Sequence, residues 1–235
     1  MSRPAVAASL PLPFELVFED GIPMDDFQHP IQMELFRNLT HEVMAERGRR
    51  DYTIGGDNFV YYSLEQAEDV VKGRPYFRGP DIFFVDGIPP REDRRGWVAW
   101  EEGGRLPDLI VEILSPSTAH IDRKDKRDLY SRVFRTREYY LLDLEKKGLE
   151  GLRLAGDLYQ AMRPTAQGRF RSELLGVDLG LWYGKYAETP GTWLRFFYPD
   201  GRMVPTPQER AEAERQRAEA AEAEVRRLRS LLGEG

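Results

Sequence analysis

Two carboxylates and one lysine in the middle of the chain have the chemistry of a phosphate-hydrolysing site. Glu112 lies inside the apolar run 109–114, Asp81 opens a second apolar run, and Lys126 follows in a charged segment. Mg²⁺ prefers hard oxygen ligands such as carboxylates and keeps several waters when it is bound. A nearby ammonium group can orient or activate a water and offset charge that develops on a phosphate. We therefore expect Asp81, Glu112 and Lys126 to form a Mg²⁺ site for hydrolysis, with Mn²⁺ as a substitute ion.

Glu112 is the most informative of the three, because it stands in what the sequence predicts to be a buried strand. Side chains alternate between the two faces of a strand, so Glu112 shares one face with Asp108, Ile110 and Leu114. A carboxylate buried alone costs several kcal/mol, so Glu112 needs a metal, a cation or hydrogen-bond donors. An ion pair with an arginine, or a position at the exposed end of the strand, would also satisfy it, and spacing alone does not decide.

The surrounding pattern predicts the elements that hold these residues. Apolar residues recur every four positions from Pro30 to about Arg47, which is typical of an amphipathic helix. A second helix is expected from about Asp122 to Arg135, with Lys126 one turn above the apolar stripe. The inner face of that helix would consist of Leu129, Tyr130, Val133 and Phe134. Runs rich in β-formers predict strands at 57–63, 81–85, 109–114 and 138–144, with shorter ones in 150–160, 168–175 and 192–198. This mixture predicts an α/β fold with a central mixed sheet.

The composition is that of a globular protein. The chain has 235 residues, of which 41% are hydrophobic, and this suits one domain with an appendage. It has no cysteine, which excludes disulfides and thiolate metal sites, and its three histidines show no zinc-ligand spacing. No apolar run is long enough to span a membrane and no signal-peptide pattern is present, so we expect a cytoplasmic protein without a membrane partner. The net charge of −6 does not by itself support a nucleic-acid partner.

The C-terminal segment 206–235 differs from the rest in composition. It begins with the sequence TPQE at 206–209, a capping box with proline at the first helical position. With Ala211 at heptad position a, six of the seven a and d positions through Leu232 are apolar. This predicts a coiled coil that joins two chains into a dimer; the alternative is a solvent-exposed helix stabilised by Glu–Arg pairs. The expected division is an extended lead-in (1–28), a core domain (29–205) and this helix (206–235).

Four short stretches, in order along the chain, carry a resemblance to a known family. They are GPDIFFV, PDLIVEILSPST, the pattern Asp122-x-x-x-Lys126-x-x-x-Tyr130, and REYYLLD. Together with the Glu/Arg/Ala-rich tail, they resemble the Uma-two family of putative restriction endonucleases, within the PD-(D/E)XK nuclease superfamily, over about residues 25–205. The resemblance implies a restriction-endonuclease-like core, in which helices flank a central mixed sheet and the catalytic residues lie at the open end of the sheet.

The resemblance also implies roles for single residues. Asp81 matches the aspartate of the family's first motif, and Glu112 matches the acidic residue of the second. The usual lysine two positions after Glu112 is replaced here by Leu114, and Lys126 matches a lysine that the family commonly carries on the following helix. A further acidic metal ligand on the first helix would be Glu34, although some relatives place a glutamate where this chain has Pro30.

Four other polar residues have alternative explanations. Asp108 is interpreted as a residue at the start of a strand, held by backbone N–H groups, rather than as a further carboxylate ligand. Asp143 is interpreted as structural or as a cap. His29, just before the first helix, is interpreted as a packing or capping residue rather than a base. Tyr130 is interpreted as a core residue whose hydroxyl could touch the site.

These observations predict a Mg²⁺-dependent endonuclease that hydrolyses phosphodiester bonds in DNA. The alternative is a catalytically inactive nuclease fold that serves as a DNA-binding or assembly module through its coiled-coil tail, an interpretation favoured by Leu114 in the usual lysine position. A further alternative is a scaffold whose function lies in the segment 206–235 alone.

Overall fold

A six-stranded mixed sheet forms the centre of the protein in the computed structural model, which describes residues 12–16, 27–73, 79–114 and 126–231. Its strands lie in the order β1-β3-β5-β6-β7-β8. Their bounds are β1 Tyr52–Gly55, β3 Ile82–Asp86, β5 Leu109–Ile113, β6 Glu138–Asp143, β7 Gly148–Ala155 and β8 Leu158–Ala161. β5 and β6 run parallel, and the other neighbours are antiparallel. The predicted α/β fold with a central mixed sheet is therefore confirmed.

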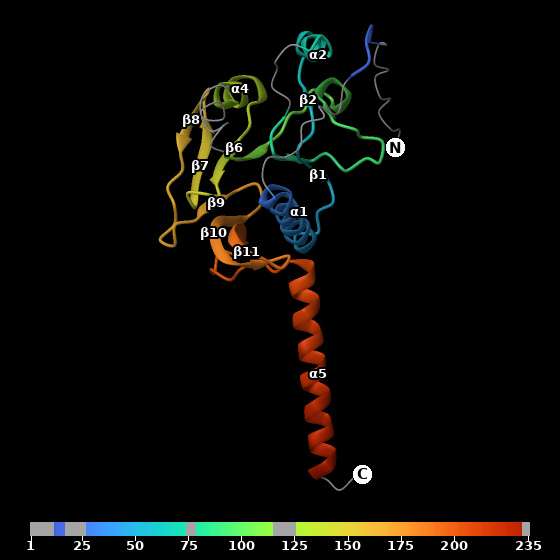
Figure 1. Ribbon diagram of the computed structural model, residues 1–235, viewed down its shortest axis with the longest axis vertical. Coiled ribbons are helices and arrows are strands. Elements are labelled where there is room, and N and C mark those ends of the chain that lie inside the picture. Colours follow the sequence, from blue (N-terminus) through green and yellow to red (C-terminus); the bar gives the residue numbers. More distant parts are fainter. Residues whose placement is uncertain (1–11, 17–26, 74–78, 115–125, 232–235) are drawn as a thin grey trace.

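Two smaller sheets and several helices surround this centre. One sheet is antiparallel and consists of β9 (Phe170–Ser172), β10 (Val177–Tyr186) and β11 (Thr189–Phe197); the other pairs β2 (Val60–Tyr61) in parallel with β4 (Trp97–Val98). The helical elements are α1 (Gln28–Glu46), α2 (Leu64–Val71), the 3₁₀ turn η1 (Ala99–Glu102), α4 (Arg127–Leu129) with the π-helical turn η3 (Tyr130–Phe134), and α5 (Pro207–Leu231). Figure 1 shows α5 extending away from the body that the other elements form.

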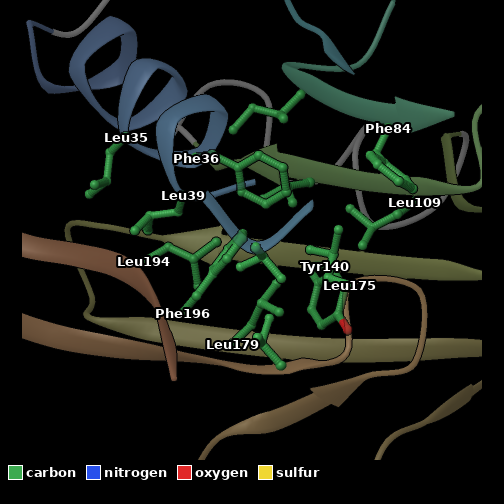
Figure 2. Close-up of a cluster of buried hydrophobic side chains, with 14 of the residues drawn as sticks. Leu35, Phe36, Leu39, Phe84, Leu109, Tyr140, Leu175, Leu179, Leu194 and Phe196 are labelled. Carbon is green, nitrogen blue, oxygen red and sulfur yellow. The ribbon is translucent and has the colours of Figure 1, made fainter. Parts of the chain in front are cut away.

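One face of the central sheet packs against α1 and the antiparallel sheet β9–β11. Leu35, Phe36 and Leu39 are fully buried because they recur on one side of α1. The ring of Phe36 meets Phe196 of β11 edge to face, with 5.1 Å between the ring centroids. Figure 2 shows this cluster, in which Tyr140 of β6 lies on the sheet side. The packing fixes α1 against the sheet, and with it the first turn of the helix.

The opposite face of the central sheet packs against α4 and η3. Leu109, Val111 and Ile113 of β5 belong to the apolar cluster on the α1 side, whereas Ile110 belongs to the cluster on the α4 side. The predicted alternation along this strand is therefore confirmed, and it places Glu112 on the side of α4.

The predicted helix 122–135 needs one correction. Its first residues, 122–125, lie outside the described residues, and the part that is described begins as α4 and widens into the π-helical turn η3. Val133, predicted on the inner face, is 46% exposed, while Tyr130 and Phe134 are buried. A π-helical turn holds more residues than an α-turn, which shifts the phase of the residues that follow it. This change of phase turns Val133 toward solvent.

Elsewhere the sequence prediction shortened one element and missed others, among them the ten-residue strand β10. The predicted strand 57–63 is reduced to β2, because Ser63 caps α2 by accepting a hydrogen bond from the backbone N–H of Gln66 at 3.1 Å. No element was predicted for β1, α2 or β10.

The base of α5 is joined firmly to the body. The backbone N–H of Thr206 donates to Glu209 at 2.7 Å, and the N–H of Glu209 donates to the Thr206 hydroxyl at 3.2 Å, so the predicted capping box is present. Glu209 also pairs with Arg195 of β11, whose side chain is fully buried, at 2.7 Å. Arg210 pairs with Glu42 at 2.6 Å on α1. The helix itself is as predicted, whereas its pairing with a second chain stays a prediction.

Candidate active site

Glu112 is fully buried at the end of β5, and polar groups from two other segments contact its two carboxylate oxygens. The ammonium of Lys126 lies 2.9 Å from Oε2, and the hydroxyl of Tyr130 donates to Oε1 at 2.5 Å. The backbone N–H of Asp81 approaches Oε2 at 3.4 Å. The partner that burial of this carboxylate requires is therefore a lysine, together with hydrogen-bond donors.

Asp81 reaches Glu112 because of the register between β3 and β5. These strands are antiparallel, and Ile82 pairs with Val111, so Asp81, just before β3, falls opposite Glu112. One oxygen of Asp81, Oδ2, accepts a hydrogen bond from the backbone N–H of Ile113 at 2.6 Å. The first two predicted site residues, 31 positions apart in sequence, are thus neighbours in space.

The electrostatic environment favours the ionised form of Asp81. Burial alone would raise the pKa of its carboxyl group, but contact with His29, the positive charge of Lys126 and the N–H of Ile113 outweigh burial and hold the pKa below its ordinary value. Nε2 of His29 lies 3.5 Å from Oδ1 of Asp81. Asp81 is therefore a carboxylate at neutral pH and available as an oxygen ligand.

Lys126 and Tyr130 reach Glu112 from one side of one helical segment. They are four residues apart, a spacing that places two side chains one above the other on a helix. The side chain of Lys126 is 18% exposed, whereas Tyr130 is fully buried. Burial raises the pKa of Tyr130 well above its ordinary value, and the adjacent Glu112 raises it further, so the hydroxyl stays protonated and can donate.

The two carboxylates of the site suit a hard divalent cation, although they are only two ligands. Asp81 and Glu112 supply carboxylate oxygens, and Mg²⁺ commonly takes only one or two protein carboxylates, with waters and substrate phosphate completing its shell. Within the part of the chain that the structure describes, no three His, Cys, Asp or Glu side chains gather as a metal-binding group. The residues therefore fit an ion held by two carboxylates and left open to substrate, not one enclosed by protein ligands.

Other residues considered from the sequence lie elsewhere. Glu34 is exposed on α1 and close to β10, where its charge adds to the larger effect of burial in raising the pKa of Tyr186. Among the described contacts, none brings Glu34 to Asp81 or Glu112. Leu114 is buried in the apolar cluster on the α4 side.

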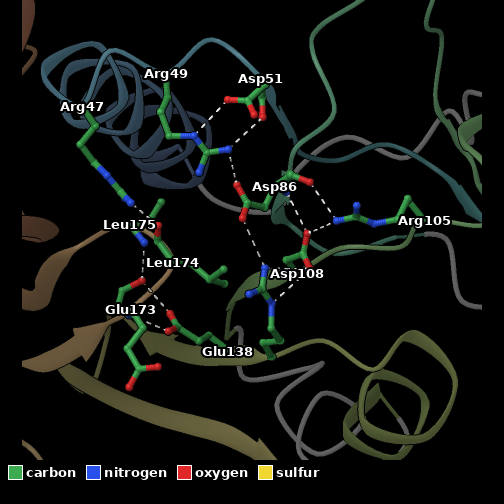
Figure 3. A network of polar contacts seen from close by, with 12 residues as sticks. Arg47, Arg49, Asp51, Asp86, Arg105, Asp108, Glu138, Glu173, Leu174 and Leu175 are labelled. Carbon is green, nitrogen blue, oxygen red and sulfur yellow. Dashed lines mark hydrogen bonds and ion pairs between the residues drawn. The ribbon is translucent and has the colours of Figure 1, made fainter.

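Asp108 lies at the opposite end of β5 from Glu112. Its Oδ2 accepts a hydrogen bond from the backbone N–H of Asp86 at 2.8 Å and pairs with Arg105 at 3.0 Å. Figure 3 shows these residues in a polar network that also includes Arg49. The interpretation of Asp108 as a residue at the start of a strand, held by a backbone N–H group, agrees with this position.

His29 and Tyr130 are the site residues whose importance the sequence indicated least clearly. His29 was interpreted as a packing or capping residue, but it contacts Asp81 from the first turn of α1. Its neighbour Pro30, where some relatives place a glutamate, was the available signal that this turn faces the site. For Tyr130 the signal was its spacing of four residues from Lys126.

In the described residues, no helix has the length and apolar character needed to cross a membrane.

No curated protein matches the chain. The crystal structure of a putative nuclease belonging to DUF820 from Anabaena variabilis is similar to the chain with a TM-score of 0.40 and 18% sequence identity; the match covers 61% of this chain and 72% of that one.

The family comparison covers most of the chain and includes the residues of the site. The model of the Uma2 family, described as "Putative restriction endonuclease", matches residues 17–185. This range contains Asp81, Glu112, Lys126 and Tyr130 and ends within β10. The chain belongs to the Uma2 family of putative restriction endonucleases.

Proposed function

We propose that the protein is a Mg²⁺-dependent endonuclease that hydrolyses phosphodiester bonds in DNA. The observation that carries the proposal is the meeting of Asp81, Glu112 and Lys126, which lie just before β3, near the end of β5 and just before α4. Membership of a family of putative restriction endonucleases supports a nuclease function and suggests DNA as the substrate.

The residues divide the chemistry between them. Asp81 and Glu112 would hold the metal ion, which supplies Lewis-acid polarisation of the phosphate and lowers the pKa of a bound water. Lys126 is the group that would orient the attacking water and offset the negative charge that develops on the phosphate. Its partial exposure allows the ammonium to move from Glu112 toward a substrate at the surface.

A plasmid-cleavage assay tests the proposal. Purified protein is incubated with supercoiled plasmid and Mg²⁺ or Mn²⁺, beside the variants Asp81→Ala and Asp157→Ala. Asp157 is a matched control, because its carboxylate is 81% exposed and pairs with Arg135 away from the site. We expect the wild type and Asp157→Ala to nick or linearise the plasmid and Asp81→Ala to leave it intact. Equal cutting by Asp81→Ala and the wild type, or no cutting with either metal, would contradict the proposal.

A second candidate function is a catalytically inactive nuclease fold used for DNA binding or assembly. The observation in its favour is Leu114, which is 7% exposed and packed among apolar residues where the usual lysine of the superfamily's (D/E)XK motif would stand. Calorimetric titration with Mn²⁺ separates the two functions, because a protein that binds no divalent ion cannot use metal-assisted hydrolysis. In either case we propose that α5 joins two chains into a dimer.

A further inference from the structure

The two oxygens of the Glu112 carboxylate face different surroundings. Oε1 accepts the hydroxyl of Tyr130, inside the apolar cluster on the α4 side. Oε2 faces the ammonium of Lys126 and the backbone N–H of Asp81. Rotation of the Glu112 side chain would exchange these two oxygens. This side chain is fully buried, so the groups that contact it decide its orientation.

Tyr130 is built into the core as a fixed donor. Its ring lies 5.3 Å from Phe134 and 5.2 Å from Tyr139, measured between ring centroids, and it is fully buried. A buried aromatic side chain packed on two sides has little rotamer freedom. Its hydroxyl donates to Oε1 of Glu112 at 2.5 Å, so the packed ring holds this donor against the carboxylate.

Tyr130 and Lys126 reach the same carboxylate because they are four residues apart in one helical segment, and a π-helical turn follows directly. Tyr130 is the first residue of η3, and Phe134, the last, is also buried. Within η3 both aromatic side chains are buried, and Lys126, the N-cap residue of α4, lies one turn before Tyr130. Local π-turns are frequent at functional sites, where they re-aim a side chain.

We propose that Tyr130 is a positioning residue, which holds Oε1 of Glu112 so that Oε2 is turned toward Asp81 and Lys126 as the metal-binding oxygen. This inference rests on the proposed function, because it assigns the oxygen that the metal would take. The two groups on Glu112 then have different duties. Lys126 is partly exposed and can give way to a cation, whereas Tyr130 is enclosed and stays. Groups that orient a ligand in this way typically change metal affinity or activity by about 10–100-fold when they are removed.

The substitution Tyr130→Phe tests the inference, with Tyr159→Phe as the matched control. Tyr159 is buried in the same cluster, and its hydroxyl donates to the backbone oxygen of Thr136 at 2.9 Å instead of to Glu112. We expect Tyr130→Phe to bind Mn²⁺ about 10–100-fold more weakly in calorimetry. We also expect a similar fall in kcat for plasmid cleavage and an unchanged KM for DNA. Wild-type or tighter Mn²⁺ binding by Tyr130→Phe, or the same loss in Tyr159→Phe, would overturn the inference.

A double-mutant cycle covers the case in which Tyr130→Phe is too unstable for calorimetry. If Tyr130 acts through Glu112, its substitution should lower the melting temperature much less in a Glu112→Met background, which has no acceptor for the hydroxyl, than in the wild type. Additive losses would overturn the inference. The test of Tyr130 can fail or succeed separately from the test of the proposed function. A wild type that binds Mn²⁺ but cuts no DNA contradicts the nuclease proposal, while the calorimetric comparison with Tyr130→Phe can still be made. A wild type that binds no Mn²⁺ would overturn the inference, because Oε2 of Glu112 would then hold no metal.

Discussion

The ammonium of Lys126 lies 2.9 Å from Oε2 of the fully buried Glu112, so this carboxylate has a counter-ion before any metal binds. A divalent cation that binds the same oxygen must compete with Lys126 for it. Lys126, which would assist hydrolysis, is therefore also the cation that neutralises Glu112 when no metal is bound. Measurements of melting temperature and of plasmid cleavage can separate these two roles.

Substitution of Lys126 by methionine should lower stability in the absence of metal, because it leaves a buried carboxylate without its cation. Removing one partner of a buried ion pair costs about 3–5 kcal/mol, an upper value here because the Lys126 side chain is 18% exposed. Thermal unfolding should show a lower melting temperature that Mn²⁺ restores, while plasmid cleavage falls by about 100-fold or more. Lys146→Met, at a side chain that is 76% exposed, should change neither. An unchanged melting temperature for Lys126→Met would contradict this account of Glu112.

Replacement of Gly79 by alanine should disturb the site through the backbone. A Cβ at Gly79 would lie 1.9 Å from the backbone oxygen of Asn58, a distance that forces the segment carrying Asp81 to move. Overpacking of this kind costs about 1–3 kcal/mol. We expect Gly79→Ala to lower both the melting temperature and the Mn²⁺ affinity. At Gly148 the nearest atom to such a Cβ is 3.6 Å away, so Gly148→Ala should leave both unchanged. Wild-type Mn²⁺ affinity in Gly79→Ala would show that Asp81 is not held by this close approach.

Asp108 should affect stability and not catalysis. Its carboxylate accepts from the N–H of Asp86 and pairs with Arg105 and with Arg137, at 3.1 Å for the last. Losing hydrogen bonds that involve charged groups costs roughly 1.5–3 kcal/mol each, so Asp108→Ala should unfold at a clearly lower urea concentration. Cleavage per folded molecule should remain close to wild type, in contrast to Asp81→Ala. Loss of cleavage at full stability would return Asp108 to the list of metal ligands.

Much of the site could be predicted because its residues lie in strongly patterned elements. The two-residue period of β5 placed Glu112 on the same face as Ile110, and the i, i+4 spacing indicated that Lys126 and Tyr130 share a helix side. What escaped prediction depends on tertiary contacts. β10 pairs two smaller strands, and a π-helical turn moved Val133 outward; neither has a distinct local pattern.

Glu34 and His29 show the same limit at the level of single residues. Both belong to α1, but a helix presents its side chains in all directions, and only packing decides which one meets a neighbouring strand. The burial of Leu35, Phe36 and Leu39 orients α1 so that Glu34 is exposed, while His29 in the first turn reaches Asp81. Sequence spacing could not supply this rotation.

The junction between β11 and α5 should weaken in acid. Burial would raise the pKa of Glu209, but Arg195 and the N–H of Thr206 outweigh it and hold the pKa below the ordinary value of 4.5. A carboxyl group with a depressed pKa stabilises the fold above its unfolded pKa, and this contribution is lost as the pH falls through the folded pKa. The urea midpoint of the wild type should therefore drop below about pH 4.5 more steeply than that of Glu209→Gln. Glu219→Gln, at an exposed site farther along α5, should follow the wild type. Parallel curves for all three proteins would contradict this role.

The charges along α5 favour a parallel arrangement of the proposed dimer. With Ala211 at heptad position a, Arg217 at g would face Glu222 at e of a second copy, and Glu224 would face Arg229. The same register places the exposed Val225 and Leu228 on the seam. Because the base of α5 is fixed to the body through Glu209 and Arg210, two parallel helices would carry both globular parts at the same end.

Single-cysteine cross-linking can test this arrangement, because the chain has no cysteine of its own. Ala221 and Leu228 both occupy d positions, and in a parallel, in-register pair each d residue meets its own copy. Ala221→Cys and Leu228→Cys should therefore both form disulfide-linked dimers under oxidised glutathione. Ala223→Cys, on the outer side of the helix, should form no disulfide-linked dimer under the same conditions. An antiparallel pair has a single centre at which a residue can meet itself, so it would cross-link at no more than one of the two d positions. Cross-linking at neither d position, with a monomeric mass in solution, would leave α5 as a single exposed helix stabilised by its Glu–Arg pairs.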